Sequence, residues 1–153
     1  MCGIFGYIGD KEAVSIILEG LKKLEYRGYD SAGIASVSGK KLTIEKALGK
    51  IADLEKLLVY KKIKGHSGIG HTRWATHGRP SKENAHPHTD CKKQIALAHN
   101  GIIENFEELK KELVGAGHKF TSQTDTEVLT HMIEDGLSGG IFEAVRKAVQ
   151  KVR

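Results

Sequence analysis

The chain has few of the residues that mark disulfide-rich or membrane-spanning proteins. Its 153 residues include two cysteines, two prolines and one tryptophan, and aromatic residues make up 6%. Two cysteines cannot build the framework on which small secreted domains depend. No stretch reaches the roughly 20 apolar residues of a membrane helix, and the first residues lack the pattern of a signal peptide. We expect one cytoplasmic domain in which Cys2 and Cys91 are free thiols, although their number alone permits a disulfide.

Charge is plentiful, but it is scattered along the chain. Lys and Arg number 24 against 19 Asp and Glu, which gives a net charge of +5. The basic residues occur mostly as separate pairs, without interleaved aromatic residues and without one continuous stripe. We interpret them as solvated surface rather than as a nucleic-acid interface.

Hydrophobic spacing predicts a mixture of strands and helices. Apolar residues that recur every three or four positions predict helices over 11–25, 51–58, 106–113, 127–133 and 141–149. Short apolar runs bounded by turn residues predict strands over 2–8, 32–37, 42–46 and 94–98. Because hairpins join several of these strands, the pattern favours an α+β or layered sandwich fold over regular βαβ alternation.

Polar residues between these elements predict caps, turns and one long loop. Caps are expected at Asp10, at Asn105 with Glu108, and at Thr124 with Glu127. Asn100-Gly101 is typical of a hairpin turn, after which a strand would resume at residues 102–103. Residues 79–92 are polar and hold both prolines, which predicts a long surface loop, and such loops are usually functional.

Cys2 can supply a nucleophile and a base in one residue. Met1 precedes a small residue, the usual condition for its removal, which would leave Cys2 with a free α-amino group. An α-amino group has a pKa of about 7.7–8.0 and can therefore accept a thiol proton near neutral pH. The thiolate that results is the nucleophilic form. A cysteine that stands at position 2 by chance would have the same sequence.

Three further segments contain groups that suit an amide substrate. Arg73, within His71–Gly78, could bind a carboxylate through two parallel hydrogen bonds, or it could be a surface residue at a strand end. Asn100 and Gly101 offer a side-chain amide and a backbone N–H, the components of an oxyanion hole, but also of a turn. Asp125 could hold an ammonium group or cap a helix.

Five segments together resemble a known family, the class II glutamine amidotransferases. In order along the chain they are Cys2–Ile4, Arg27–Gly33, His71–Gly78, His99–Gly101 and Thr124–Glu127. The resemblance covers all 153 residues, and the second and third segments favour the members that aminate fructose 6-phosphate. It implies an N-terminal-nucleophile hydrolase fold, which is an α+β, four-layer α/β/β/α sandwich of two mostly antiparallel sheets.

The resemblance also implies a role for each candidate site residue. Cys2 would attack the side-chain amide of L-glutamine, and a thioester would form before glutamate and ammonia are released. The other roles are an oxyanion hole at Asn100 and Gly101, glutamine binding by Arg73, Thr76, His77 and Asp125, an ammonia gate at Trp74, and positions beside the nucleophile for Arg27 and Gly28. No cofactor and no metal are expected.

The family's glutaminase domain is longer than this chain. We expect residues 1–153 to be a partial domain that lacks C-terminal strands of the sandwich, and the sugar-isomerase domains to be absent. Unpaired sheet edges would follow. Fructose 6-phosphate would be a partner only of the missing domains, and the full-length enzyme would be a homo-oligomer.

Three alternatives remain open at this point. The segment His86–Cys91 holds four groups that could bind zinc, although their spacing matches no established ligand pattern and the family segment holds no metal. The chain could also be a non-catalytic truncated module. It could, finally, be a fragment of another class II amidotransferase.

Overall fold

The computed structural model describes residues 2–75 and 78–153. Its first half runs through β1 (Gly3–Ile8), α1 (Ala13–Lys22), a 3-10 turn η1 (Glu25–Arg27), β2 (Ser31–Ser38), β3 (Lys41–Leu48), α2 (Ile51–Tyr60) and β4 (Ser67–Arg73). Its second half runs through β5 (His88–Thr89), β6 (Ala96–Leu97), α3 (Phe106–Gly115), α4 (Thr126–Gly136), a 3-10 turn η2 (Leu137–Gly139) and α5 (Ile141–Lys151).

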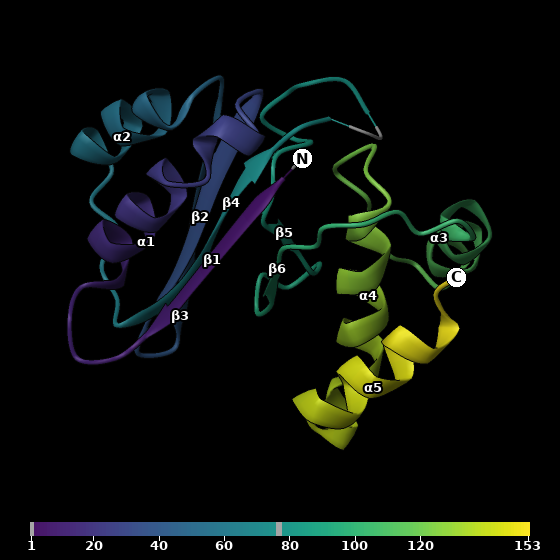
Figure 1. Cartoon of the computed structure of the whole chain (residues 1–153). Coiled ribbons are helices and arrows are strands. Elements are labelled where there is room, and N and C mark those ends of the chain that lie inside the picture. The colour runs from purple at the N-terminus through teal and green to yellow at the C-terminus, as the bar shows by residue number, and fades with distance from the viewer. Residues whose placement is uncertain (1, 76–77) are drawn as a thin grey trace.

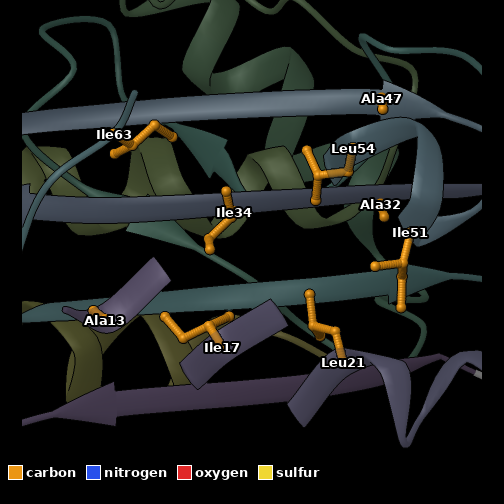
Figure 2. Packing of buried hydrophobic residues seen from close by; sticks show 9 residues of the cluster. All are labelled: Ala13, Ile17, Leu21, Ala32, Ile34, Ala47, Ile51, Leu54 and Ile63. Atoms are coloured by element: carbon orange, nitrogen blue, oxygen red, sulfur yellow. The ribbon is translucent and has the colours of Figure 1, made fainter. Parts of the chain in front are cut away.

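The larger sheet is antiparallel and has the strand order β1-β4-β2-β3. β2 and β3 form the predicted hairpin, in which Gly39 adopts a left-handed φ of 60° at the turn. Helices α1 and α2 cover one face of this sheet (Figure 1). The buried residues of the core between helices and sheet are all aliphatic, as Figure 2 shows: Ala13, Ile17, Leu21, Ala32, Ile34, Ala47, Ile51, Leu54 and Ile63.

Strand β4 contributes residues to both faces of the sheet: one face packs on the apolar core under α1, and the other carries polar side chains. A Cβ atom added at Gly70 would lie 2.5 Å from Ile17, so glycine at this position lets α1 pack directly on the strand. Because successive residues of a strand point to opposite faces, His71 and Arg73 lie on the face away from α1. Both side chains are buried there.

The second half of the chain builds the remaining layers. β5 and β6 pair antiparallel, and α4 packs on them and on α5. Figure 1 shows this part on the side of the large sheet opposite α1 and α2. A second apolar core joins its helices: Ile103, Leu109, Leu113, Val128, Leu129, Ile133, Ala144 and Ala148. The order of layers is helices, four-stranded sheet, two-stranded sheet and helices, as the α/β/β/α expectation requires.

Two further expectations, about the cysteines and about membrane-spanning helices, can be compared with the structure. Cys2 and Cys91 are free cysteines, as predicted. Among the described residues, no helix combines the length and the apolar character needed to cross a membrane.

The hairpin predicted at Asn100-Gly101 is wrong. β6 ends at Leu97 and pairs with β5, and residues 102–103 form no strand. Gly101 has a φ of 153°, which is far from the left-handed values of a two-residue hairpin turn. Ile103 is instead buried in the second core, and its N–H donates to Asp125 over 2.8 Å.

Asn105 and Asp125 occupy the predicted N-cap positions of α3 and α4, but none of the predicted side-chain cap bonds forms. α1 begins at Ala13 without a side-chain cap, so Asp10 does not serve as one. Asn105 makes no cap bond, and its amide instead binds the backbone of Lys151 and of Arg153. α4 likewise lacks a side-chain cap, and Glu127 binds the segment that precedes the helix.

The segment 79–92 is less exposed than predicted. Residues 84–88 are all buried, and the strand β5 begins within the segment at His88. A Cβ atom at Gly33 of β2 would lie 2.2 Å from the carbonyl oxygen of His86, so this segment packs directly on the large sheet. The prediction of a surface loop is therefore wrong for its central part.

Candidate active site

A cavity of about 490 Å³ lies where the polar face of the large sheet meets the start of α4. This volume is within the usual range for a small-molecule site. The residues that line it are Cys2, Arg27, Arg73, Trp74, His86, His99, Asn100, Gly101, Ile102, Thr124, Asp125 and Thr126. Seven of these were predicted as site residues from the sequence. Gly28 does not line the cavity but packs against the backbone of Thr72 and Arg73. Thr76 and His77 fall outside the described residues.

Cys2 stands directly before β1, on the face of the sheet opposite α1. The next residue, Gly3, pairs with Thr72 of β4, which brings Cys2 beside the end of β4. The backbone N–H of Trp74 donates to Cys2 Sγ over 3.2 Å, and the Trp74 carbonyl oxygen lies 3.4 Å from the same sulfur. The thiol is therefore held against the chain that leaves β4.

The segment Arg27–Gly33 braces that same stretch of chain. A Cβ atom at Gly28 would approach the backbone of Thr72 and Arg73 to 3.0 Å, so glycine lets this segment pack directly on the end of β4. Asp30 accepts a hydrogen bond from the N–H of Ala75 and another, at 2.8 Å, from the Ser31 hydroxyl. Because Ala75 follows Trp74, this carboxylate fixes the backbone that faces Cys2 Sγ.

Two charged side chains form opposite parts of the cavity wall. Arg73 is 3% exposed, and its Nη2 donates to the carbonyl oxygen of Gly78 over 3.1 Å. Asp125 is equally buried, and its Oδ2 accepts the N–H of Ile103. A cavity with a guanidinium and a carboxylate in its wall has the charges that suit a zwitterionic amino acid.

Asn100 is oriented by a buried histidine that the sequence analysis did not single out. Its Oδ1 lies 2.9 Å from Nε2 of His71, and its Nδ2 donates to the carbonyl oxygen of Cys2 over 3.3 Å. His71 must carry its proton on Nε2 to donate to an amide oxygen. The amide N–H₂ of Asn100 is thereby directed towards the nucleophile.

Burial keeps His71 neutral. It lowers the pKa of His71 to about 4; the hydrogen bond with Asn100 raises this pKa, and the positive charges of Arg73 and His99 lower it further. A neutral ring with its proton on Nε2 is the form that orients Asn100. The orientation therefore holds over the whole neutral pH range.

His71 belongs to a row of three buried histidines. His86 Nδ1 lies 3.1 Å from His71 Nε2, and the ring of His86 meets the rings of His71 and His88 edge to face. Burial lowers the pKa of His86 well below its usual value and that of His88 to about 3. His88 Nε2 lies 2.8 Å from the hydroxyl of Thr124, so the row joins β4 to the residues that precede α4.

The tautomer of His71 decides that of His86. Since His71 Nε2 carries a proton, His86 Nδ1 must face it with a lone pair, and the proton of neutral His86 then lies on Nε2. His86 lines the cavity, and its Nε2 has no hydrogen-bond partner within residues 2–75 and 78–153. The spacing of His86 and His88, two residues apart in the segment that leads into β5, was the available signal, but the sequence analysis considered this segment only for zinc.

The remaining lining residues flank the predicted motifs. His99, Ile102, Thr124 and Thr126 each stand next to a predicted site residue, and His99 Nδ1 lies 3.4 Å from the hydroxyl of Thr126. In the sequence, only their position beside a predicted site residue indicated that they would line the cavity.

The zinc alternative for residues 86–91 is not supported, because its four groups diverge. His86 and His88 belong to the histidine row. Asp90 accepts the N–H groups of Gln94 and Ile95 through one oxygen and so closes its own loop. Cys91 points to a different cluster, with His118 and His131.

Sequence comparisons agree with this arrangement. A family model described as a glutamine amidotransferase domain matches residues 59–140. The chain is similar to the glutamine–fructose-6-phosphate aminotransferase (isomerizing) of Pyrococcus horikoshii, with 56% identity over 155 residues that cover 100% of this chain and 26% of that protein. The corresponding protein of Aquifex aeolicus is also 56% identical, over 153 residues, with the same coverage. The chain thus spans about a quarter of the length of these relatives.

Structural comparisons give the same family. The glutamine phosphoribosylpyrophosphate amidotransferase of B. subtilis, solved with ADP and GMP, superimposes with a TM-score of 0.86 at 33% identity, over 100% of this chain and 33% of that one. A structure described as the allosteric regulatory enzyme of purine biosynthesis gives a TM-score of 0.86 at 34% identity, with the same coverage. The N-terminal-nucleophile hydrolase fold is thereby confirmed. Since the family model matches more than half of its residues, this chain belongs to the glutamine amidotransferase domain family.

Proposed function

We propose that this chain hydrolyses L-glutamine to L-glutamate and ammonia, with Cys2 as the nucleophile after removal of Met1. One observation carries the proposal. Cys2 and Asn100 are 98 residues apart in the chain, yet the amide of Asn100 lies 3.3 Å from the backbone of Cys2 at the edge of the cavity. A buried histidine directs the N–H₂ group of that amide towards the nucleophile.

The first step is attack of Cys2 Sγ on the side-chain amide carbon of glutamine. The free α-amino group of Cys2 takes the thiol proton and returns it to the leaving nitrogen, so the carbon–nitrogen bond breaks and ammonia departs. A thioester remains. Water then attacks the thioester, with the same amino group as base, and releases glutamate and the thiol.

Charge that develops on the amide oxygen requires hydrogen-bond donors. Asn100 Nδ2 and the N–H of Gly101 supply them in this proposal, and both residues line the cavity. Gly101 adopts a φ of 153°, and a Cβ atom there would lie 2.8 Å from the ring of His99, so only glycine fits without strain. Donors that are fixed before the reaction cost no reorganisation when the oxyanion forms.

The backbone of glutamine would lie between the two charges of the wall. Arg73 would bind the α-carboxylate, and Asp125 would bind the α-ammonium through Oδ1, since its Oδ2 accepts the Ile103 N–H. Thr76 and His77 stay in the proposal as pocket residues. We add His86 as a further pocket residue, because it lines the cavity.

The molecule that accepts the ammonia would be bound by the whole protein, since this chain spans only about a quarter of the length of its relatives. We propose fructose 6-phosphate, bound by further sugar-isomerase domains, with glucosamine 6-phosphate as the product. The 56% identity to fructose-6-phosphate aminotransferases, against 33% to a phosphoribosylpyrophosphate amidotransferase, favours this acceptor. The whole protein would be a cytoplasmic homo-oligomer.

Trp74 would gate the passage of ammonia in that assembly. Its side chain is 47% exposed at the cavity and meets the ring of Tyr29 edge to face, with centroids 5.2 Å apart. Its own backbone contacts Cys2 Sγ, so movement of the ring is tied to the site of ammonia release.

The decisive experiment blocks the α-amino group and leaves the thiol intact. A chain with a bulky residue inserted between Met1 and Cys2 keeps its methionine, and we expect no glutamate release from it in a steady-state assay. The matched control is the same chain with a protease site before Cys2; cleavage that exposes Cys2 should restore hydrolysis. Full activity of the blocked chain would disprove the amino-group base.

Replacement of the thiol separates catalysis from a purely structural role. We expect Cys2→Ala to fold normally and to release no glutamate, and Cys2→Ser to be severely weakened because a hydroxyl is far less acidic. A correctly processed and folded wild-type chain that releases no glutamate would favour the non-catalytic module instead.

A further inference from the structure

The structure holds a second cluster of reactive side chains, away from the cavity and unused by the proposed function. It consists of Cys91, which follows β5, His118, which follows α3, and His131 and Glu134 on α4. One potential ligand atom from each residue lies within 4.8 Å of the other three. Three separate segments of the chain therefore converge on one point.

We propose that this cluster is a structural zinc site with four protein ligands. Cys91 Sγ lies 3.6 Å from Nδ1 of His118 and 3.6 Å from Nδ1 of His131. Glu134 Oε2 lies 3.2 Å from Nδ1 of His118 and 3.4 Å from Nδ1 of His131. The same ring nitrogen of each histidine thus faces both the sulfur and the carboxylate.

These separations match the edges of a zinc tetrahedron. Bonds of about 2.3 Å to sulfur and about 2.0–2.1 Å to nitrogen or oxygen imply edges of about 3.6 Å between sulfur and nitrogen and about 3.4 Å between nitrogen and oxygen. The remaining two pairs, sulfur with carboxylate and imidazole with imidazole, lie within 4.8 Å, so the side chains need to close by about 1–1.5 Å at most to complete the tetrahedron. A thiolate and a carboxylate would also neutralise the two positive charges of the ion, which suits a site whose histidines and glutamate are largely buried.

The surroundings of the ligands suit metal binding as well. His118 Nε2 donates to Asp135 Oδ1 over 2.9 Å, and His131 Nε2 lies 3.8 Å from Glu127 Oε1. Carboxylates behind both rings favour the proton on Nε2 and leave Nδ1 free to bind the ion. The backbone N–H of Lys119 lies 3.5 Å from Cys91 Sγ, where it would stabilise a thiolate.

The geometry indicates a structural rather than a catalytic metal. Four protein ligands leave no open position for water or substrate. Glu134 lies eight residues along α4 from Thr126, which lines the cavity, so the cluster is about 12 Å from the cavity end of the helix. The ion would pin the loop after β5 and the loop after α3 to α4, and Cys91, which is exposed, gives it a route of entry.

The first test measures metal content in the folded chain. We expect one zinc per chain after growth with zinc and dialysis against a weak chelator. Cys91→Ser and His118→Ala should lose it, whereas the matched controls Cys2→Ser and His66→Ala should keep it. Absence of zinc from wild type loaded in this way would overturn the proposal, and so would zinc that persists in both cluster variants.

The second test uses wild type alone, so it does not depend on whether the variants fold. X-ray absorption at the zinc edge should report one sulfur and three nitrogen or oxygen neighbours. Cobalt substitution of the wild-type chain should give a thiolate-to-metal charge-transfer band. A coordination shell without sulfur would overturn the proposal. Neither test involves glutamine, so its outcome is independent of the proposed hydrolysis.

Discussion

The two halves of the molecule are held together by different means. The half with α1, α2 and the large sheet packs nine aliphatic side chains into one core and carries the nucleophile at its edge. The half with α3, α4 and α5 also has an apolar core, but it buries polar groups along α4, including Glu127, Thr130 and His131. Non-directional packing suits a rigid frame, whereas directional bonds fix loops at defined positions.

The cavity lies between these halves and draws on both. Cys2 and Arg73 come from the sheet, and Thr124 and Asp125 come from the residues before α4. The histidine row joins the two, from His71 on β4 to His88 and its partner Thr124. A substitution that destabilises either half should therefore affect the site, through lost apolar packing in the first half and through lost buried hydrogen bonds in the second. The predictions below distinguish these two effects.

The largest effect is expected from a cavity in the aliphatic core. Leu21 is fully buried between α1 and the sheet, so Leu21→Ala should lower the free energy of unfolding by about 2–5 kcal/mol. Urea denaturation measures this, with Leu48→Ala as control, since Leu48 is 54% exposed. Equal losses in both variants would contradict the claim that this half depends on apolar packing.

Asn100→Ala should remove one oxyanion donor at the junction of the halves. We expect kcat for glutamine hydrolysis to fall by about 10²–10³-fold, or about 3–4 kcal/mol of transition-state stabilisation, with little change in stability. Asn105→Ala is the matched control, because its amide binds the backbone of Lys151 and Arg153, away from the cavity. An unchanged kcat in Asn100→Ala would remove the assigned oxyanion hole.

Acid should weaken the link between the halves. The folded pKa of His71 is about 4 and that of His88 about 3, because burial disfavours the charged rings, while an unfolded histidine has a pKa of about 6.5. The unfolded chain therefore binds protons that the native chain excludes, and stability falls as pH drops from about 6.5 towards 4. His71 alone accounts for roughly 3 kcal/mol of this loss at the acid end.

Denaturation midpoints between pH 7 and pH 4.5 test this dependence. We expect His88→Gln to flatten the curve, whereas His66→Gln, at an exposed position, should leave its slope unchanged. A wild-type curve that is flat over this interval would contradict the assigned neutral histidines.

Glu127→Gln should destabilise the half of the molecule that contains α3, α4 and α5, by less than Leu21→Ala destabilises the other half. The carboxylate accepts four hydrogen bonds of 2.6–2.8 Å, from the backbone and hydroxyl groups of Thr121 and Ser122. An amide nitrogen cannot accept, so at least one buried donor loses its partner at a cost of about 1–3 kcal/mol. Amide hydrogen exchange should rise at residues 121–122 and stay unchanged in β2; a uniform rise would contradict the separate roles of the halves.

Glu127 also adds a second acid-sensitive interval. Although burial raises its pKa, the nearby ring of His131 and the hydrogen bonds from Ser122 and Thr121 outweigh burial and lower it to about 2. Its contribution is fully present above its ordinary value of about 4.5 and is lost as pH falls towards 2. This interval lies below that of the histidines, so Glu127→Gln should change the slope of the stability curve only in strong acid, while it lowers the whole curve at higher pH.

Local patterns in the sequence predict the proposed chemistry of this protein and determined much of its first half. The hairpin of β2 and β3 and the apolar face of α1 follow from residues that lie near one another in the chain. The pair Met1-Cys2 is equally local, and it predicts a residue that would carry both a thiol and a free α-amino group. Such features depend on the spacing of a few residues, and spacing is visible in the sequence.

Only the tertiary structure decided where distant polar groups meet. Asn105 matches a local capping pattern, yet its side-chain amide binds the backbone of Lys151 and Arg153, 46 and 48 residues further along the chain. The pairing of His71 with Asn100, and the convergence of Cys91 with α4, join segments far apart in the chain. Their geometry depends on how the layers pack, and no local pattern contains that information.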